Sequence, residues 1–519
     1  MKNSDSRKPD LGNTDTKKFD SFINIFKHAN EAYPERKAII LEEESRTYGE
    51  LYENARRIAG YIHSLGIGKG DRIAVISRNS VDYIETVLGC IMAGAVAVKL
   101  NWRLAPPELH YLLVFNQVKL IFFRSQDAQI RREVQELVST LCPSVDMELL
   151  GELAAEAVPL ETFEECGENE VLMHLHTSGT TGVPKTVRYV KGRFLQELSD
   201  CVEALGFPEG EVFQQMSQLF HSACIGTYSC LASGGTVVLF RKFDPEAYLA
   251  SVERNRVTRM SAIPTVLVAL LNHPHLEQYD LSSIRIINYS TCPMPPELIR
   301  RAIAKFHCGF QQSYGMTEMG SIVTMLMPED HLRDQMKYLN SVGKPIGSHQ
   351  VRVADEQGAD CPAGAIGEVL AKGPGMMLDY YRMPEETGHA LADGWYHTKD
   401  MGYLDEDGYL YICGRKHDLI ISGGENIFPL EVENVLKSHP GIEDVAVLGM
   451  PDPYWGEAVH ACVTLKNGQQ LTEEQIRSFC RGKIAGYKIP KQVHILTQMP
   501  LTATGKIKKP ELAKWIREK

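Results

Sequence analysis

The sequence predicts an α/β protein, with a large N-terminal domain of parallel-type α/β sheets that carries a small β subdomain, and a mobile α+β C-terminal domain. Three observations lead to this prediction. Between residues 22 and 306, β-branched runs alternate with helical patterns, as is typical of a buried parallel sheet covered by helices. Between Val342 and Cys413, short β-like runs are broken by Gly, Pro and Asp. From Pro429 onward, a second alternation is long enough to fold separately.

These changes in the sequence pattern give the expected domain boundaries. We expect a disordered polar tail at residues 1–18, an N-terminal domain at 19–414 with its β subdomain at about 341–413, a hinge at 415–418 and a C-terminal domain at 419–519. The tail has no apolar stretch of the kind found in a signal peptide or a transit helix.

The periodicity of apolar residues places the individual elements. Helical spacing predicts helices at residues 48–65, 81–92, 245–255, 264–272, 295–306, 429–438 and 472–484. Runs of β-branched and apolar residues predict strands at residues 72–77, 95–100, 171–175, 186–190, 236–240, 260–263, 284–289, 351–354, 367–372, 409–413, 445–449, 459–465 and 492–497.

The composition excludes several classes of protein. The formal net charge of the 519 residues is −11, so no positive field would gather a nucleic-acid backbone, and we expect no nucleic-acid partner. The longest uncharged apolar runs, residues 89–98 and 262–271, are too short to span a bilayer, so no transmembrane segment is expected. The twelve cysteines are scattered singly, and we interpret them as buried thiols in a reducing, cytoplasmic setting.

The loop between the strands predicted at 171–175 and 186–190 has an unusual composition. Its glycines free the backbone to turn and expose its N–H groups, while its hydroxyls and one ammonium add donors that suit phosphate oxygens. A Walker A loop is rejected, because Val183 and Pro184 separate the last glycine from the lysine. A flexible surface loop is the alternative interpretation. The residues are Thr177, Ser178, Gly179, Thr180, Thr181, Gly182 and Lys185.

Two further clusters stand out, and the first of them follows a predicted strand, where ligands of open α/β sheets bind. The first is the small-residue turn Ser290, Thr291, Cys292 and Pro293. The second is Ser313, Tyr314, Gly315, Met316, Thr317 and Glu318. A helix is not expected through Gly315, so Thr317 and Glu318 can face a pocket, and a carboxylate beside phosphates makes sense chiefly as a Mg²⁺ ligand.

The remaining clusters have more ordinary alternatives. Phe220 and His221 form an aromatic pair after a possible strand, and a lone histidine is more often a satisfied core residue. Asp400 can accept two ribose hydroxyls and Arg415 can bind ribose or phosphate, although an aspartate in a turn is common. Lys506 follows a glycine in a tight loop, and it either presents its charge to another surface or belongs to a solvated basic face. A glycine-rich turn is formed by Ser422, Gly423, Gly424 and Glu425.

Taken together, these motifs resemble the adenylate-forming superfamily, which contains acyl- and aryl-CoA synthetases, firefly luciferase and the adenylation domains of peptide synthetases. The resemblance covers the chain from about Phe22 to its C-terminus, with the motifs in family order. They are residues 177–185, 314–318, 414–415 with 422–426, and 500–506. By this resemblance the chain is identified as a member of the acyl-/aryl-CoA synthetase (AMP-dependent synthetase/ligase) family.

The resemblance implies an acid–thiol ligase. The substrate carboxylate attacks the α-phosphorus of ATP, which gives acyl-AMP and pyrophosphate, and the acyl group then passes to the thiol of CoA. ATP, Mg²⁺ and CoA are the implied cofactor and co-substrates. Lys506, His221, Thr317 and Glu318 are the implied catalytic residues, with Glu318 holding Mg²⁺ and Lys506 bridging the carboxylate and the α-phosphate.

The other motif residues are implied to bind ATP. The loop from Thr177 to Lys185 would hold the β- and γ-phosphates, Ser290 to Pro293 would flank adenine, and Asp400 with Arg415 would fix the ribose. Ser313, Tyr314, Gly315 and Met316 complete the implied nucleotide site.

The resemblance also assigns an acyl pocket and a CoA tunnel. The C-terminal domain would rotate about a hinge at His417, and the turn of Ser422, Gly423, Gly424 and Glu425 would then line a tunnel for the thiol arm. The implied acyl pocket consists of His221, Ile225, Gly226, Met319 and Ile322. Because Phe220 is followed by His221, and not by the Asp of amino-acid-activating relatives, an apolar acid is favoured, either aryl or fatty acyl.

Four positions depart from the family pattern. These are His417 at the hinge, Lys399 before the ribose aspartate, the turn after Tyr289, and Gln218 in place of a common Pro. Two alternatives stay open: an acyl-AMP ligase that loads the phosphopantetheine of an acyl carrier protein, and a non-catalytic nucleotide-binding relative. A homodimer also stays open.

Overall fold

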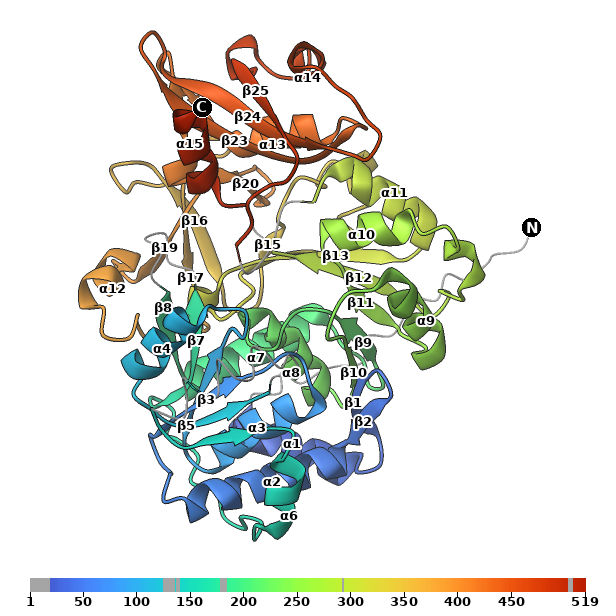
Figure 1. Ribbon diagram of the computed structural model, residues 1–519, viewed down its shortest axis with the longest axis vertical. Coiled ribbons are helices and arrows are strands. Elements are labelled where there is room, and N and C mark those ends of the chain that lie inside the picture. Colours follow the sequence, from blue (N-terminus) through green and yellow to red (C-terminus); the bar gives the residue numbers. More distant parts are fainter. Residues whose placement is uncertain (1–18, 125–135, 137–140, 178–183, 292–293, 503–506) are drawn as a thin grey trace.

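The computed structural model describes residues 19–124, 136, 141–177, 184–291, 294–502 and 507–519 (Figure 1). The predicted tail at residues 1–18 lies outside the described residues. The same holds for the predicted site residues Ser178, Gly179, Thr180, Thr181, Gly182, Cys292, Pro293 and Lys506.

One sheet of the N-terminal part has nine strands, in the order β15-β14-β13-β12-β11-β9-β10-β1-β2. Its central strands, from β13 to β1, run parallel, while β2, β14 and β15 add antiparallel pairs at the edges. The predicted parallel sheet is therefore confirmed. The bounds are β1 Lys37–Leu41, β2 Glu44–Thr47, β9 Val212–Gln215, β10 Thr236–Leu239, β11 Arg259–Ser261, β12 Ile286–Ser290, β13 Gly309–Tyr314, β14 Thr324–Leu326 and β15 Lys344–Pro345.

A second sheet has six strands, in the order β6-β5-β3-β4-β7-β8. All its neighbours pair in parallel except β7 and β8, which form an antiparallel hairpin. The strands that flank the predicted phosphate loop are thus confirmed. The bounds are β3 Arg72–Ile76, β4 Val96–Leu100, β5 Val118–Phe123, β6 Ser144–Asp146, β7 Val171–Thr177 and β8 Lys185–Val190.

Helices connect and cover these strands (Figure 1). The predicted helices at 81–92 and 245–255 are confirmed residue for residue, as α3 and α9. All residues of α3 are buried, and the core cluster to which it belongs joins the two sheets, for example through Ile39 of β1 and Val75 of β3. The helices are α1 Phe22–Ala32, α2 Tyr48–Ser64, α3 Val81–Met92, α4 Pro106–Phe115, α6 Leu150–Glu156, α7 Lys191–Leu205, α8 Ile225–Ala232, α9 Pro245–Asn255, α10 Pro264–Leu271 and α11 Pro296–Phe306.

A smaller antiparallel sheet follows, with β16-β17-β19-β18 in order and β20 paired to β19. Its strands are β16 Gln350–Ala354, β17 Gly367–Lys372, β18 Leu391–Ala392, β19 Trp395–Leu404 and β20 Leu410–Arg415, and α12 is Pro384–Ala390. Short 3-10 turns occur at η1 Ser222–Cys224, η2 Leu276–Gln278, η3 Thr317–Met319, η4 Arg333–Met336, η5 Lys416–Asp418 and η6 Gly486–Lys488.

The C-terminal part, orange to red at the top of Figure 1, has its own sheet and core. The strand order is β22-β21-β24-β23, with β25 parallel to β24. Helix α14 is shorter than the predicted 472–484, because Arg481 is already extended and Gly482 has a φ of 77°. The elements are β21 Ile420–Ser422, β22 Glu425–Ile427, β23 Ile442–Asp452, β24 Gly456–Leu465, β25 Gln492–Leu496, α13 Pro429–Lys437, α14 Glu473–Cys480 and α15 Lys509–Glu518.

The cysteine prediction is only partly confirmed. The cysteines in the described ranges are all free thiols, and most of them are buried. Cys142, Cys308, Cys361 and Cys413 are only partly buried, because the first three lie in loops and Cys413 lies on the edge strand β20. None of the described helices combines the length and the hydropathy that a bilayer-crossing segment needs.

Candidate functional site

The predicted phosphate loop sits at the tip of the β7–β8 hairpin. Thr177 and Lys185 are paired in register, so the strands deliver both ends of the loop to one place. Behind it, His174 Nδ1 lies 2.8 Å from Asn116 Oδ1, and His176 Nδ1 lies 3.1 Å from the carbonyl oxygen of Lys99. Burial lowers the pKa of His176 to about 4, so its ring is neutral near pH 7 and stabilises the strand without adding charge.

Lys185 is buried, and its ammonium forms an ion pair with Glu386 of α12. The ammonium also lies 4.9 Å from the centroid of the Tyr380 ring. The lysine lowers the pKa of the Glu386 carboxyl, so this carboxylate is charged at neutral pH. A partly exposed carboxylate is a modest partner for the lysine.

Thr317 and Glu318 lie together on η3, next to the end of β7. The Tyr189 hydroxyl donates a hydrogen bond to the Thr317 carbonyl, and the Thr317 hydroxyl lies 3.3 Å from the Ser222 hydroxyl. The Tyr380 hydroxyl donates to Glu318 Oε1 at 2.9 Å. Glu318 is buried, so its carboxylate is held in one orientation with its charge largely shielded from water.

Gly315 has a steric reason to be glycine. A Cβ at this position would lie 1.8 Å from the carbonyl oxygen of Ser321, where the chain doubles back after η3. The close approach brings β13 directly into the turn that carries Thr317 and Glu318.

Asp400 and Arg415 are opposite each other on β19 and β20. Arg415 Nε lies 2.9 Å from Asp400 Oδ1, and the Tyr314 hydroxyl donates to Asp400 Oδ2 at 2.6 Å. Burial, and then the neighbouring Asp400, raise the pKa of the Tyr314 hydroxyl, so it remains a donor. These contacts bring Tyr314, at the end of β13, together with the predicted ribose pair.

The predicted adenine turn begins where β12 ends. Ser290 pairs in register with Ser313 of β13, so the two motif clusters share one edge of the nine-stranded sheet. Thr291 has a φ of 72°, a conformation that is rare for a β-branched residue. Such strain is often found where a ligand binds.

The predicted acyl-pocket residues divide into two groups. His221 is partly exposed and follows Phe220, with the two ring centroids 4.2 Å apart. The other residues, Ile225, Gly226, Met319 and Ile322, are buried. Gly226 faces the Phe213 ring, because a Cβ there would lie 3.3 Å from it. Because Ser222 contacts Thr317, the neighbouring His221 lies near η3. The other predicted residues lie in or beside the hydrophobic core.

The predicted hinge and tunnel residues lie beyond the β19–β20 pair. His417 is on η5, with Nε2 3.5 Å from Asp418 Oδ1 and its side chain half exposed. Ser422 and Glu425 close a two-residue hairpin turn in which Gly423 and Gly424 have φ values of 61° and 84°. Both values favour glycine, and a Cβ on Gly423 would meet the Trp455 ring at 2.9 Å.

This geometry agrees with a family match along most of the chain. Residues 26–381 match the AMP-binding enzyme family, and residues 431–506 match the AMP-binding enzyme C-terminal domain. The chain belongs to the AMP-binding enzyme family. The resemblance recognised from the sequence is therefore confirmed.

Individual relatives cover almost the whole chain. A feruloyl-CoA synthase from Amycolatopsis sp is 36% identical over 90% of this chain and 93% of its own length. A fatty acid–[acyl-carrier-protein] ligase from Streptomyces coeruleorubidus is 31% identical over 92% of this chain and 93% of its own. The o-succinylbenzoate CoA synthetase from Bacillus subtilis, solved with its acyl-adenylate intermediate, has a TM-score of 0.85 and 31% identity over 94% of this chain and 97% of its own.

These matches establish the type of enzyme. The chain is an AMP-forming acid–thiol ligase that uses ATP, Mg²⁺ and CoA. The predicted fold class, with a large α/β part and a smaller C-terminal part, is confirmed as well.

Several contacts in this AMP-binding enzyme were not predicted from its sequence. Tyr189, Tyr380 and Glu386 each bond a predicted site residue from 62 to 201 positions away. Contacts between residues so far apart in the sequence cannot be predicted from patterns of neighbouring residues. Tyr380 and Glu386 do lie in one polar stretch, but tyrosine and glutamate are too common in loops for this to have marked them.

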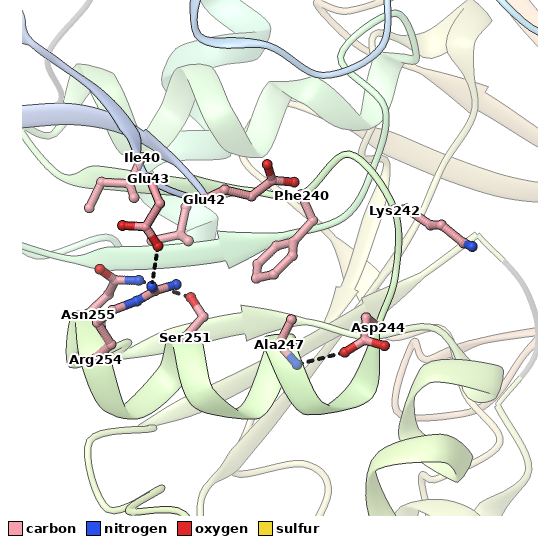
Figure 2. Close-up of a pocket in the computed structure, with 11 residues that line it drawn as sticks. Ile40, Glu42, Glu43, Phe240, Lys242, Asp244, Ala247, Ser251, Arg254 and Asn255 are labelled. Carbon is pink, nitrogen blue, oxygen red and sulfur yellow. Dashed lines mark hydrogen bonds and ion pairs between the residues drawn. The ribbon is translucent and has the colours of Figure 1, made fainter. Parts of the chain in front are cut away.

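A separate surface pocket of about 400 Å³ lies between α9 and the strands β1 and β10 (Figure 2). Arg254 and Glu43 form an ion pair at 2.9 Å across it. None of its lining residues belongs to the predicted nucleotide or acyl site, which lies around η3. The lining consists of Ile40, Glu42, Glu43, Val238, Phe240, Lys242, Asp244, Ala247, Ser251, Arg254 and Asn255.

Proposed function

We propose that the residues gathered around η3 are the site at which this ligase activates an apolar carboxylic acid, aryl or fatty acyl. One observation carries the assignment. The hydroxyl of Thr317 and the carboxylate of Glu318 are adjacent on one short turn, held by Tyr189, Ser222 and Tyr380 from three other parts of the chain. A turn fixed from so many directions is preorganised for charge that develops during phosphoryl chemistry.

The physical problem in the first half-reaction is repulsion between two anions, the substrate carboxylate and ATP. Lys185 would exchange Glu386 for the outer phosphates, and Thr317 would donate its hydroxyl to the α-phosphate. Lys506, by resemblance, would bridge the carboxylate and the α-phosphate. Together these groups hold like-charged reactants in contact and stabilise the charge of the transition state.

The donor set around Glu318 fits Mg²⁺. No cluster of three or more His, Cys, Asp and Glu side chains occurs among the residues that the structure describes, and Glu318 is a single hard-oxygen ligand. Mg²⁺ is typically held by one or two carboxylates plus substrate phosphates, and not by an all-protein cage. When bound, Mg²⁺ would neutralise phosphate charge. Glu318 would hold it, and Tyr380 would orient the Glu318 carboxylate.

The rest of the nucleotide would lie along the adjacent sheet edges. Asp400 would accept the ribose hydroxyls, since each carboxylate oxygen can accept more than one hydrogen bond. Arg415 and Tyr314 would hold that carboxylate in place, as they do in the structure. The turn that begins at Ser290 would flank the adenine.

We further propose that the C-terminal domain, taken as residues 419–519, rotates about the hinge between half-reactions. The Ser422–Glu425 turn would then line the path of the CoA thiol arm. Gly424 supports this role, since a Cβ there would meet no atom within 4 Å, so this side of the turn faces open space.

The thiol acceptor has one specific alternative. A relative named for an acyl-carrier-protein substrate matches nearly all of this chain, so a carrier-protein phosphopantetheine is the second candidate. The two acceptors share the adenylation step, and only the second half-reaction separates them.

One assay tests the function. A panel of aryl and fatty acids is incubated with ATP and Mg²⁺, and release of AMP and pyrophosphate is measured without acceptor, with CoA and with a phosphopantetheinylated carrier protein. We expect AMP and pyrophosphate with at least one acid, and faster turnover with CoA. ADP formation would exclude the proposed chemistry, and stimulation by the carrier protein would identify it as an acceptor beside CoA.

A further inference from the structure

Lys99 is a buried lysine that the proposed chemistry does not use. It lies in β4, where every residue is buried, and is itself 1% exposed. In the described part of the chain its ammonium has no carboxylate partner. Its contacts are the Cys224 sulfur at 2.8 Å and the Tyr228 ring, whose centroid is 5.6 Å away. A thiol is a weak acceptor and buried charges are normally paired, so this ammonium lacks a counter-group.

Two tyrosine hydroxyls in the same cluster lack partners too. Tyr83 of α3 and Tyr228 of α8 are buried, and neither hydroxyl has a hydrogen-bond partner among the described residues. Burial, and then the neighbouring Cys224, raise the pKa of both hydroxyls, so both remain donors. Buried polar groups are nearly always satisfied, and an exception calls for a water, ion or ligand. The Lys99 ammonium and the two tyrosine hydroxyls are therefore three donors near Cys224 that call for an acceptor.

The cluster of Lys99, Tyr83, Tyr228 and Cys224 lies one 3-10 turn away from Thr317, in the proposed reaction centre. Cys224 ends η1, which begins at Ser222, and the Ser222 hydroxyl is 3.3 Å from the Thr317 hydroxyl. A 3-10 helix rises only about 2 Å per residue, so Thr317 and Lys99 lie on either side of a single turn. His221, Ile225 and Gly226, which were predicted to line the acyl pocket, flank this turn. An acid activated at Thr317 whose body extends past η1 would place its far end near Cys224 and Lys99.

We propose that Lys99, with the hydroxyls of Tyr83 and Tyr228, binds an oxygen at the end of the substrate remote from the activated carboxyl. The substrate class is then an acid with an apolar body and a distal carboxylate or phenolic oxygen. An anionic oxygen fits best, because it neutralises the buried ammonium. This inference rests on the proposed function, which it refines by naming the substrate class.

Matched acids test the preference in the unaltered enzyme. Pyrophosphate release is measured with cinnamate, 4-hydroxycinnamate and 4-carboxycinnamate, and with octanoate and octanedioate. Within at least one series we expect kcat/KM to be about 10- to 100-fold higher for the oxygen-bearing acid, as for a hydrogen bond to a charged group. Equal kcat/KM across each series would overturn the inference while leaving the proposed function intact. No pyrophosphate with any acid would count against the proposed function itself.

Variants identify the residues responsible. Lys99→Met keeps the length of the side chain but removes the charge, and it should abolish the preference by slowing only the oxygen-bearing acids. Lys191→Met is the matched control, because Lys191 is another buried lysine but pairs with Glu165 at 3.5 Å. It should leave the preference unchanged.

A purely structural role for Lys99 would give a different result with the Lys99→Met variant. Loss of activity on all acids alike, in a folded Lys99→Met protein, would overturn the assignment. If that variant does not fold, Tyr228→Phe and Tyr83→Phe decide, since each removes only one hydroxyl. Each should reduce the preference while sparing the unsubstituted acids, and an unchanged preference in both would reject the site.

Discussion

Replacing Tyr380 with Phe tests how the site holds its metal-binding carboxylate. The substitution removes one hydroxyl, which donates to Glu318 Oε1 at 2.9 Å, and keeps the ring that lies beside Lys185. A hydrogen bond to a charged group contributes about 1.5–3 kcal/mol. The backbone of η3 remains fixed, because the Met377 N–H still donates to the Glu318 carbonyl at 2.8 Å and Tyr189 still bonds Thr317. We therefore expect an effect near the lower limit.

That limit corresponds to roughly a tenfold change in the affinity for Mg²⁺, since about 1.4 kcal/mol is a factor of ten in an equilibrium constant. The Mg²⁺ concentration that gives half-maximal pyrophosphate release should rise about tenfold in Tyr380→Phe, with little change in the thermal midpoint. Glu318→Gln should show a larger rise. Tyr381→Phe is a suitable control, because Tyr381 is adjacent in sequence but packs against His174. An unaltered Mg²⁺ requirement in a folded Tyr380→Phe protein would refute the reasoning.

Three more predictions concern Lys506, the hinge and the β7–β8 hairpin. Lys506→Ala should slow adenylation about 10²- to 10³-fold, measured by pyrophosphate exchange, and near-normal exchange would reject its bridging role. His417→Pro should impair thioester formation more than adenylation in separate half-reaction assays, whereas equal losses would argue against domain rotation. The pKa of His176, lowered by burial, predicts that its contribution to stability is present above about pH 6.5 and is lost as the pH falls toward about 4. His176→Gln should reduce the change in the thermal midpoint with pH between about pH 6.5 and pH 4. An unchanged pH dependence of the midpoint would contradict this.

The sequence alone identified the elements whose signals are local. Helix α9 begins after the capping side chain of Asp244 with Pro245 in its first turn, and α3 is an apolar run bounded by turn residues, so both were predicted to the residue. The motifs that include Thr177, Thr317 and Asp400 are equally local, because each depends on residue types at fixed short spacing. They were sufficient to recognise the family, and with it the ligase chemistry, because the motifs recur in family order.

Only the tertiary structure decided which residues support that chemistry. Tyr380 reaches Glu318 across 62 positions and Lys99 reaches Cys224 across 125, and periodicity contains no information about such pairs. A lysine within a β-branched strand was visible in the sequence, but its burial beside Cys224 was not. The physical reason is that secondary structure follows from neighbours along the chain, whereas charge pairing and orientation follow from elements that packing brings together.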